Sequence, residues 1–261
     1  MRGGASEIDL SVIIPAYNEA ARILPCLTEM SASLGRRSRP YEILVVDDGS
    51  RDGTAAVVEE FRTKHPAVRL LRLARNTGKG GAIRRGIQEA RGELQLIADA
   101  DGATPFQELT RLEASIGNGA DIAIGSRVLA ARDRRYRVKA RWHRTALGTF
   151  FNWVVRRLGI RGISDTQCGF KLFRKAVAQD LFSVAWVDGY GFDLEILYVA
   201  QRRGYRISEV PVNWADRPGS KVWVLRDGAR MLRDLLAVRR RHARGRYDAK
   251  QRPVSRLETS G

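Results

Sequence analysis

Short apolar runs alternate with longer segments of helical periodicity through the first half of this 261-residue chain. Five runs are typical of strands: residues 10–15, 43–46, 68–73, 94–98 and 122–124. Between them, apolar residues recur at helical spacing over about residues 18–34, 52–64, 80–90 and 105–116. Strands separated by helices predict a mostly parallel central sheet with helices on both faces, which is an α/β fold.

A polar cluster follows each of these runs. In an open parallel sheet, ligands bind beyond the carboxyl ends of the strands, where the loops that follow the strands meet. The clusters are Pro15-Ala16-Tyr17-Asn18-Glu19, Asp47-Asp48-Gly49-Ser50, Asn76-Thr77-Gly78-Lys79-Gly80-Gly81, Asp99-Ala100-Asp101 and Gly125-Ser126-Arg127. Unrelated loops would not all place polar groups at the same edge, so the sequence predicts one binding site there.

Asp99 and Asp101 stand one residue apart at the end of the fourth apolar run. Neighbours at that spacing on an extended chain point the same way, so the two carboxylates can reach one cation together. Oxygen ligands suit Mg²⁺ or Mn²⁺, and the oxygens of a nucleotide diphosphate complete the octahedron. The alternative is a turn rich in Asp and Gly that caps the next helix. We expect that helix to start with Thr104 as the N-cap and Pro105 at the first helical position.

The other clusters suit a nucleotide sugar. Tyr17 offers a ring on which a base can stack, and Glu19 or Asp48 can accept hydrogen bonds from base N–H groups. Lys79 and Arg127 add positive charge near a diphosphate. Each feature also has an ordinary structural interpretation: a packing tyrosine, a turn over residues 47–50, and a glycine-rich turn over residues 78–81 that lacks the spacing of a Walker loop.

The formal net charge of +17 comes mostly from arginines, concentrated in residues 127–161 and from residue 226 onward. Such a field attracts polyanions, which include nucleic acid, an anionic membrane surface and phosphorylated substrates. We do not expect nucleic-acid binding, since no helix-turn-helix, zinc-finger or aromatic RNA-binding signature accompanies the charge.

The two cysteines, Cys26 and Cys168, form no close pair. This predicts reduced thiols and neither a zinc site nor a redox motif. The N-terminus shows no signal peptide, and no apolar run approaches the ~18 residues of a spanning helix.

The second half of the chain is less regular. Residues 132–144 are almost solidly basic and predict a mobile loop, and the remaining pattern predicts helices over 145–158, 192–202 and 222–239 and a strand over 207–212. We expect one domain over residues 1–240, with a nucleotide-sugar-binding half (9–127) and an acceptor- and membrane-facing half (128–240). Residues 241–261 form a basic tail poor in aromatic residues, which we expect to be disordered.

Taken in order, the motifs resemble those of glycosyltransferase family 2. The matching stretches are residues 12–19, 45–54, 76–80, 99–101 and 125–127, and the resemblance covers about residues 9–240. It implies the GT-A fold and an inverting, metal-dependent transfer of a sugar from a sugar nucleotide.

Within that family the chain looks most like the polyprenyl-phosphate glycosyltransferases, and closest to the branch that transfers glucose to dolichyl phosphate. Residues 99–104, 165–173 and 210–221 carry this match. The resemblance implies UDP-glucose as donor and a polyprenyl, dolichyl-type phosphate as acceptor. GDP-mannose or another sugar nucleotide as donor, and a polysaccharide or other non-lipid acceptor, stay open as alternatives.

The resemblance also implies roles for single residues. Carried over by position, those that bind the nucleotide sugar are Pro15, Ala16, Tyr17, Glu19, Val46, Asp48, Lys79, Asp99, Ala100, Asp101, Arg127, Arg217 and Lys221. Asp99 and Asp101 also hold the metal, and the acceptor side consists of Asp165, Thr166, Gln167 and Lys171.

The predicted catalytic residues are Asp165, Asp101 and Arg127. Asp165 either orients or deprotonates the acceptor, and its alternative role is that of a turn or cap. Asp193 and Glu195 either position the sugar or lie on the surface of a helix.

Members of this branch carry membrane-spanning helices, which this sequence does not show. We therefore expect peripheral binding to anionic lipid at the cytoplasmic face of the cell membrane, through helices 145–158 and 222–239 and the basic loop. The second helix has an apolar stripe with arginines beside it: Val222, Leu225, Ala229, Leu232 and Leu236, flanked by Arg226, Arg230 and Arg233. The alternative is that both stripes pack on the sheet. The sequence carries no prediction of oligomeric state.

Overall fold

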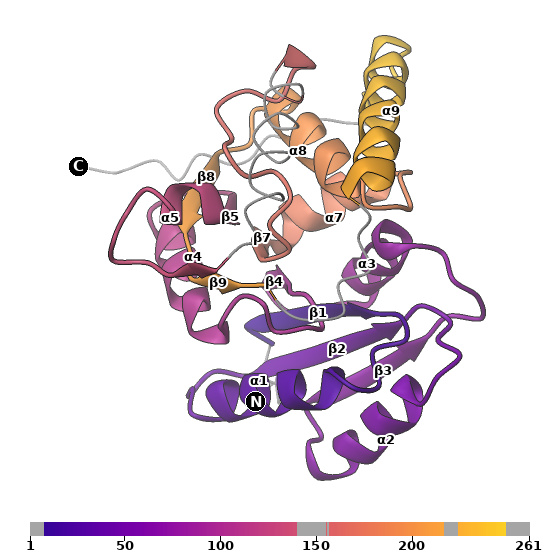
Figure 1. Cartoon of the computed structure of the whole chain (residues 1–261), viewed down its shortest axis with the longest axis vertical. Coiled ribbons are helices and arrows are strands. Elements are labelled where there is room, and N and C mark those ends of the chain that lie inside the picture. The colour runs from indigo at the N-terminus through magenta and orange to yellow at the C-terminus, as the bar shows by residue number, and fades with distance from the viewer. Residues whose placement is uncertain (1–7, 140–154, 156, 217–223, 249–261) are drawn as a thin grey trace, which may run out of the picture.

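A computed structural model describes residues 8–139, 155, 157–216 and 224–248 of the chain (Figure 1). Its core is a seven-stranded sheet with strand order β3-β2-β1-β4-β7-β5-β8. The strands are β1 (Leu10–Ala16), β2 (Tyr41–Asp47), β3 (Val68–Arg72), β4 (Leu94–Ile97), β5 (Ile122–Ser126), β7 (Lys171–Arg174) and β8 (Ile207–Pro211). The predicted α/β class and the mostly parallel sheet are confirmed.

β7 is antiparallel to both of its neighbours, β4 and β5. Lys171, its first residue, pairs with Ile97 of β4 and Ile124 of β5. An antiparallel strand starts where its parallel neighbours end, so the loop before β7 lies at the same edge as the loops that follow β1, β2, β4 and β5. We call this edge the rim. The sequence pattern did not predict β7, because the strand is short and begins with a lysine.

Helices cover both faces of the sheet. One face packs against the buried side chains of three helices: α1 (Ile23–Gly35), α2 (Thr54–Lys64) and α4 (Leu109–Gly117). The other face packs against those of four helices: α3 (Lys79–Glu89), α7 (Lys175–Val184), α8 (Phe192–Arg202) and α9 (Val224–Ala243). Figure 1 shows this separation, with α1 and α2 on one side of β1–β3 and α3 on the other. Two short helical segments, η1 (Phe106–Glu108) and α5 (Arg127–Ala130), complete the described helices.

Two predicted helix starts are wrong. α1 begins at Ile23 instead of residue 18, because the preceding segment is bound to the loop after β2: the amide of Asn18 donates to Ser50 Oγ at 2.9 Å and that of Glu19 to Thr54 Oγ1 at 2.8 Å. Thr104 is not an N-cap. The short helix η1 has Pro105 at its N-cap position, and Glu29 Oε1 accepts from the amide of Phe106 at 3.2 Å.

The basic segment after α5 is described as far as residue 139. Val138 and Lys139 form β6, which pairs in parallel with β9 (Trp214–Ala215), and the amide of Ala215 donates to Ala103 O at 2.9 Å. This part of the predicted mobile loop is therefore a strand close to the Asp99–Asp101 motif. The remainder of the loop, and all of the predicted helix 145–158 except residues 155, 157 and 158, lies outside the described residues.

The predicted disorder of the tail is wrong for its first residues. α9 extends to Ala243, and the turn that follows it buries Tyr247 to 3% exposure. We call residues 244–248 the C-terminal turn; residues 249–261 lie outside the described residues. Over the described parts of the chain, no helix is long and apolar enough to cross a membrane.

Candidate active site

A cavity of about 790 Å³ opens at the rim, and we call it the donor pocket. Nine residues predicted from the sequence line it: Pro15, Ala16, Tyr17, Glu19, Asp48, Lys79, Asp99, Ala100 and Asp101. The opposite wall consists of residues 189–191 and of Arg230, Met231, Arg233 and Asp234 from α9. This wall was not predicted from the sequence, because its residues match no motif and reach the rim only through tertiary packing.

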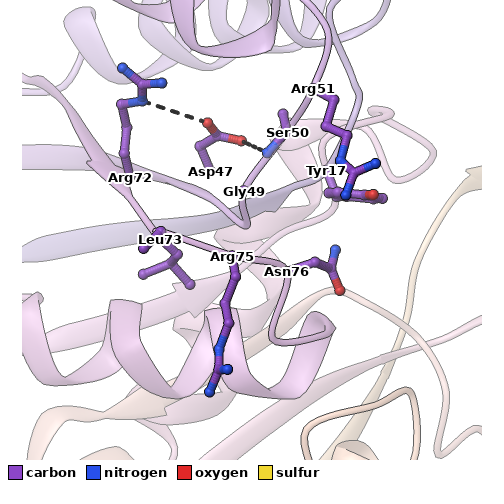
Figure 2. Close-up of a pocket in the computed structure, with 10 residues that line it drawn as sticks. Tyr17, Asp47, Gly49, Ser50, Arg51, Arg72, Leu73, Arg75 and Asn76 are labelled. Atoms are coloured by element: carbon purple, nitrogen blue, oxygen red, sulfur yellow. Dashed lines mark hydrogen bonds and ion pairs between the residues drawn. The ribbon is translucent and has the colours of Figure 1, made fainter.

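A second hollow of about 590 Å³ adjoins the donor pocket and shares Tyr17 and Asn76 with it. Figure 2 shows Tyr17, Arg51 and Asn76 on one side of this hollow and Asp47 with Arg72 on the other. Asp47 accepts a hydrogen bond from the amide of Ser50 at 3.1 Å and lies 4.0 Å from Arg72 Nε. Tyr17 thus lines both cavities.

The carboxylate of Asp48 holds the loop that precedes α3. One oxygen accepts from the amide and the hydroxyl of Thr77, both at 2.7 Å, and the other accepts from the amide of Gly78 at 2.8 Å. Asp48 therefore shapes the loop before α3, and it also lines the donor pocket, where its contact with a base stays a prediction. Val46 is fully buried in the core beneath α3 and does not line the donor pocket. Glu19 pairs with Arg22 at 2.6 Å.

Lys79 and Asp99 form an ion pair in the donor pocket, with Nζ 2.6 Å from Oδ1. The Asp99 carboxylate also lies against the backbone of residue 169, where a Cβ would come within 2.0 Å of Oδ2, so only glycine fits there. Burial alone would raise the pKa of Asp99, but the positive charge of Lys79, then of Lys171 and Arg127, holds it below its ordinary value.

The pKa of Asp101 is shifted in the opposite direction to that of Asp99. Its Oδ1 accepts a hydrogen bond from the amide of Ala103 at 3.0 Å. Burial and the negative charge of Asp99 raise its pKa above the ordinary range. Two carboxylates that repel each other in one pocket are a suitable donor set for a divalent cation. Among the described residues no third His, Cys, Asp or Glu joins them in a cluster, which leaves coordination positions for phosphate and water oxygens.

Arg127 is bound to Asp165 by a two-pronged ion pair. Nε and Nη2 of Arg127 each donate to one Asp165 oxygen at 2.7 Å, and the amide of Arg127 adds a third bond at 2.9 Å. Asp165 is 2% exposed. Burial raises the pKa of Asp165, but the charge and hydrogen bonds of Arg127 outweigh this and hold the pKa below its ordinary value. Asp165 thus holds the guanidinium of Arg127 in a fixed position.

Lys171, which was predicted on the acceptor side, lies buried beneath the rim. It is 1% exposed, and its Nζ lies 2.5 Å from both Cys168 O and Asp193 Oδ1. Lys171 and Asp193 therefore form a buried ion pair beneath the rim. Among the described residues, neither the buried hydroxyl of Thr166 nor the buried Nε2 of Gln167 finds a hydrogen-bond partner. Arg217 and Lys221 lie outside the described residues.

Both cysteines are free and buried. Burial, followed by the charge of Asp101, raises the pKa of Cys26 to about 12, and burial raises the pKa of Cys168 to about 11. Both thiols are therefore protonated and unreactive at neutral pH.

The fold and the site together define a protein of the GT-A glycosyltransferase class. The profile of the family "Glycosyl transferase family 2" matches residues 11–182, and the chain belongs to this family. The predicted family and fold are confirmed.

Among characterised relatives, the human dolichyl-phosphate beta-glucosyltransferase is 40% identical over 255 residues, which cover 93% of this chain and 78% of the relative. The enzyme of the same name from Dictyostelium discoideum is 39% identical over 254 residues, covering 93% of this chain and 77% of the relative. That from Saccharomyces cerevisiae is 37% identical over 258 residues, covering 92% and 77%.

Solved structures support the fold. Glucosyl-3-phosphoglycerate synthase from Mycobacterium tuberculosis, in complex with Mn²⁺, UDP-glucose and phosphoglyceric acid, aligns with a TM-score of 0.63 at 19% identity, covering 94% of this chain and 81% of that one. Mannosyl-3-phosphoglycerate synthase from Rubrobacter xylanophilus aligns with a TM-score of 0.64 at 21% identity, covering 92% and 76%. At these identities the similarity shows the architecture alone.

Proposed function

We propose that this protein is an inverting, divalent-metal-dependent glucosyltransferase that moves glucose from UDP-glucose to a dolichyl-type polyprenyl phosphate. The observation that carries the proposal is the donor pocket, in which Asp99 and Asp101 face a space lined by the nucleotide-binding motif of residues 15–19. The relatives named as dolichyl-phosphate beta-glucosyltransferases support the choice of sugar and acceptor.

In this proposal the uracil ring lies against Tyr17, at the junction of the donor pocket and the adjoining hollow in Figure 2. Stacking on an aromatic ring combines apolar burial with a defined ring geometry. Asp48 contributes by holding the loop over residues 76–78, and Lys79 follows this loop directly.

Asp101 and Asp99 would hold Mg²⁺ or Mn²⁺, which when bound neutralises the negative charge that develops on the departing diphosphate. Lys79 sits 2.6 Å from Asp99 and is the nearest described cation to that carboxylate. Arg230 and Arg233 bring further positive charge to the pocket wall. These fixed charges stabilise the leaving group without reorganisation during the reaction.

The acceptor is a phosphate monoester, whose second pKa lies near ~6, so it is largely ionised at neutral pH. It can attack the anomeric carbon from the face opposite the leaving diphosphate without a strong general base. This agrees with Asp165, whose oxygens accept hydrogen bonds from Arg127. Arg127, held rigidly by Asp165 and lying 5.4 Å from the Trp214 ring, supplies positive charge on the acceptor side of the rim.

The proposal includes peripheral binding at the cytoplasmic face of the membrane through α9. Met231, Leu235 and Val238 form the buried face of this helix, whereas Leu236 is 43% exposed and Ala229 is exposed. Of the described residues of the predicted apolar stripe, Leu232 is partly buried and packs against the core, whereas Ala229 and Leu236 are exposed. Exposed Arg239 and Arg240 follow the stripe, and a basic residue near anionic lipid contributes ~1 kcal/mol.

A donor screen with polyprenyl phosphate in detergent tests the proposal. We expect UDP-glucose to be the best donor, turnover to stop with EDTA, and Mn²⁺ or Mg²⁺ to restore it. Faster turnover of GDP-mannose than of UDP-glucose would refute the donor assignment. Turnover with a soluble saccharide acceptor in place of the lipid phosphate would refute the acceptor assignment.

A further inference from the structure

We infer that the C-terminal turn sets the position of one wall of the donor pocket, and that Tyr247 is the positioning residue that does so. The inference rests on the proposed function only for the identity of the donor. The contacts that carry it run from Tyr247 through Glu195 to the loop over residues 185–191, and from that loop to the first turn of α3.

Tyr247 is anchored at both sides of its hydroxyl. The hydroxyl donates to Glu195 Oε1 at 2.6 Å and accepts from Trp186 Nε1 at 2.8 Å. The backbone of the same residue is held as well, since Tyr247 O accepts from Arg203 Nη2 at 2.7 Å. A tyrosine that is 3% exposed, so close to the end of the described chain, is thus tied to α8 and to the loop before it.

Glu195 is completely buried on α8 and uses its carboxylate to hold the backbone of that loop. Its oxygens accept from the amide of Trp186 at 3.1 and 3.0 Å, and Oε2 accepts from the amide of Val187 at 2.8 Å. A buried carboxylate needs all of its hydrogen bonds, because an unsatisfied charge in the core is costly. The Tyr247 hydroxyl is the one side-chain donor to Glu195 among the hydrogen bonds of the described residues.

The loop in turn rests on the first turn of α3. Asp188 O accepts from the amides of Gly80 at 2.7 Å and Gly81 at 3.2 Å. The approach is so close that a Cβ on residue 80 would lie 2.3 Å from Val187 O. Arg84 of α3 pairs with the Asp188 carboxylate and also donates to Ala185 O at 3.3 Å.

Both ends of this contact belong to the donor pocket. Residues 189–191 of the loop line the pocket directly. On the α3 side, Lys79 precedes Gly80 and holds Asp99. Loss of the Tyr247 hydroxyl should therefore loosen the loop and weaken donor binding, while the groups that take part in the chemistry stay in place.

The test uses the full-length protein with Tyr247→Phe, which keeps the ring and removes the hydroxyl. Tyr205→Phe is the matched control, because Tyr205 donates the same kind of bond to Asp180 at 2.8 Å and neither residue lines the donor pocket. Three quantities are measured: hydrogen exchange by mass spectrometry over residues 185–191 and 79–83, the affinity for UDP with Mn²⁺ by calorimetry, and KM and kcat for UDP-glucose.

In Tyr247→Phe we expect faster exchange over residues 185–191 and 79–83. We also expect about a five-fold loss of UDP affinity, within the range for the loss of one ordinary intramolecular hydrogen bond, and a matching rise in KM with kcat little changed. Tyr205→Phe should show neither effect at a comparable loss of thermal stability. Trp186→Phe removes the bond donated to the Tyr247 hydroxyl and leaves a smaller aromatic ring beside Arg241. It keeps the bond from Tyr247 to Glu195, so it is the milder second variant and should show the same pattern at smaller size.

Unchanged exchange over residues 185–191 in Tyr247→Phe and Trp186→Phe would overturn the inference, whatever the donor. The same holds if Tyr205→Phe weakens UDP binding as much as Tyr247→Phe. If exchange rises as expected but the wild type binds no uridine nucleotide, the positional role of Tyr247 stands and the proposed donor is wrong.

Discussion

The two halves of the rim use their carboxylates in different ways. After β4, Asp99 and Asp101 face the donor pocket, and the negative charge of one raises the pKa of the other. In the half built on β5, β7 and α8, Asp165 and Asp193 are 2% and 4% exposed, and each is bound to a single cation. The first pair is arranged to receive a charged ligand, whereas the second pair fixes the position of Arg127 and Lys171.

This difference assigns chemistry to one half of the site and positioning to the other. A carboxylate in a solvent-filled pocket can exchange partners, because water and ligand oxygens replace one another at modest cost. A fully buried ion pair cannot, because removal of either partner leaves an uncompensated charge in the core. Substitutions in the two halves should therefore fail in different ways, and the following variants test that.

The largest effect is expected on stability at Lys171. Lys171→Met leaves Asp193 buried without its partner, and loss of one member of a buried pair costs ~3–5 kcal/mol of unfolding free energy. Urea denaturation measures it. Lys175→Met is the control, because Lys175 pairs with exposed Glu93 at 3.1 Å and a surface pair contributes at most ~1 kcal/mol.

The double variant Lys171→Met/Asp193→Leu should recover much of the lost stability, since it removes the orphaned charge. If Lys171→Met is as stable as Lys175→Met, the Lys171–Asp193 pair does not have the structural role assigned to it.

Asp101→Ala should reduce kcat by at least ~100-fold, because it removes a charge that helps to hold the metal at the leaving diphosphate. Its thermal stability should change little or rise, since the substitution relieves repulsion from Asp99. Steady-state kinetics and a melting curve measure the two quantities. Asp133→Ala, at a carboxylate paired with exposed Arg135, is the control and should keep wild-type turnover. Near-native turnover of Asp101→Ala would contradict the assignment of the metal site.

Asp165→Asn should flatten the dependence of stability on acid pH. The folded-state pKa of Asp165 is lowered, so the unfolded chain binds more protons between the folded pKa and its own value near ~3.9. Stability from this carboxylate is therefore present above about pH 4 and is lost as the pH falls through the folded pKa. Urea midpoints from pH 6 to pH 3 should fall more steeply in the wild type than in the variant. Equal slopes would show that Asp165 is not held ionised by Arg127.

The smallest effect is expected at the membrane. Leu236→Ser removes a side chain that is 43% exposed on α9, and it should weaken flotation with anionic liposomes a few-fold without lowering the melting temperature. Leu24→Ser is the matched control, since Leu24 is 46% exposed on α1, which packs on the opposite face of the sheet. Binding that is insensitive to salt, or equal effects of the two variants, would refute binding through α9.

The first half of the chain was largely predictable from its sequence. β1 to β5 lie where short apolar runs are bounded by polar clusters, because burial on both faces of a parallel sheet selects apolar residues at every position of a strand. Ligands of such a sheet bind beyond the carboxyl ends of its strands, and this rule predicted that Tyr17, Lys79 and Asp101 share one site. In the structure all three line the donor pocket.

The second half was less predictable because its important contacts join segments distant in sequence. β7 is a four-residue strand whose place between β4 and β5 is decided by pairing with both. Asp165 and Lys171 were expected at the acceptor surface, but each found a partner inside the protein, Arg127 and Asp193 respectively. The burial of Tyr247 depends on Glu195, 52 positions earlier in the chain.

The sequence by itself determined the α/β fold, the family, and the two carboxylates that follow β4, since these depend on local periodicity and on motifs of consecutive residues. Only the tertiary structure decided which charged side chains stay open to a ligand. From the sequence, Asp165 and Lys171 were expected to contact a ligand as Asp101 was, yet each is buried in an ion pair, with Arg127 and Asp193 respectively. The reason is physical: a charged group in the interior must be compensated by a neighbour in space, and sequence spacing does not specify that neighbour.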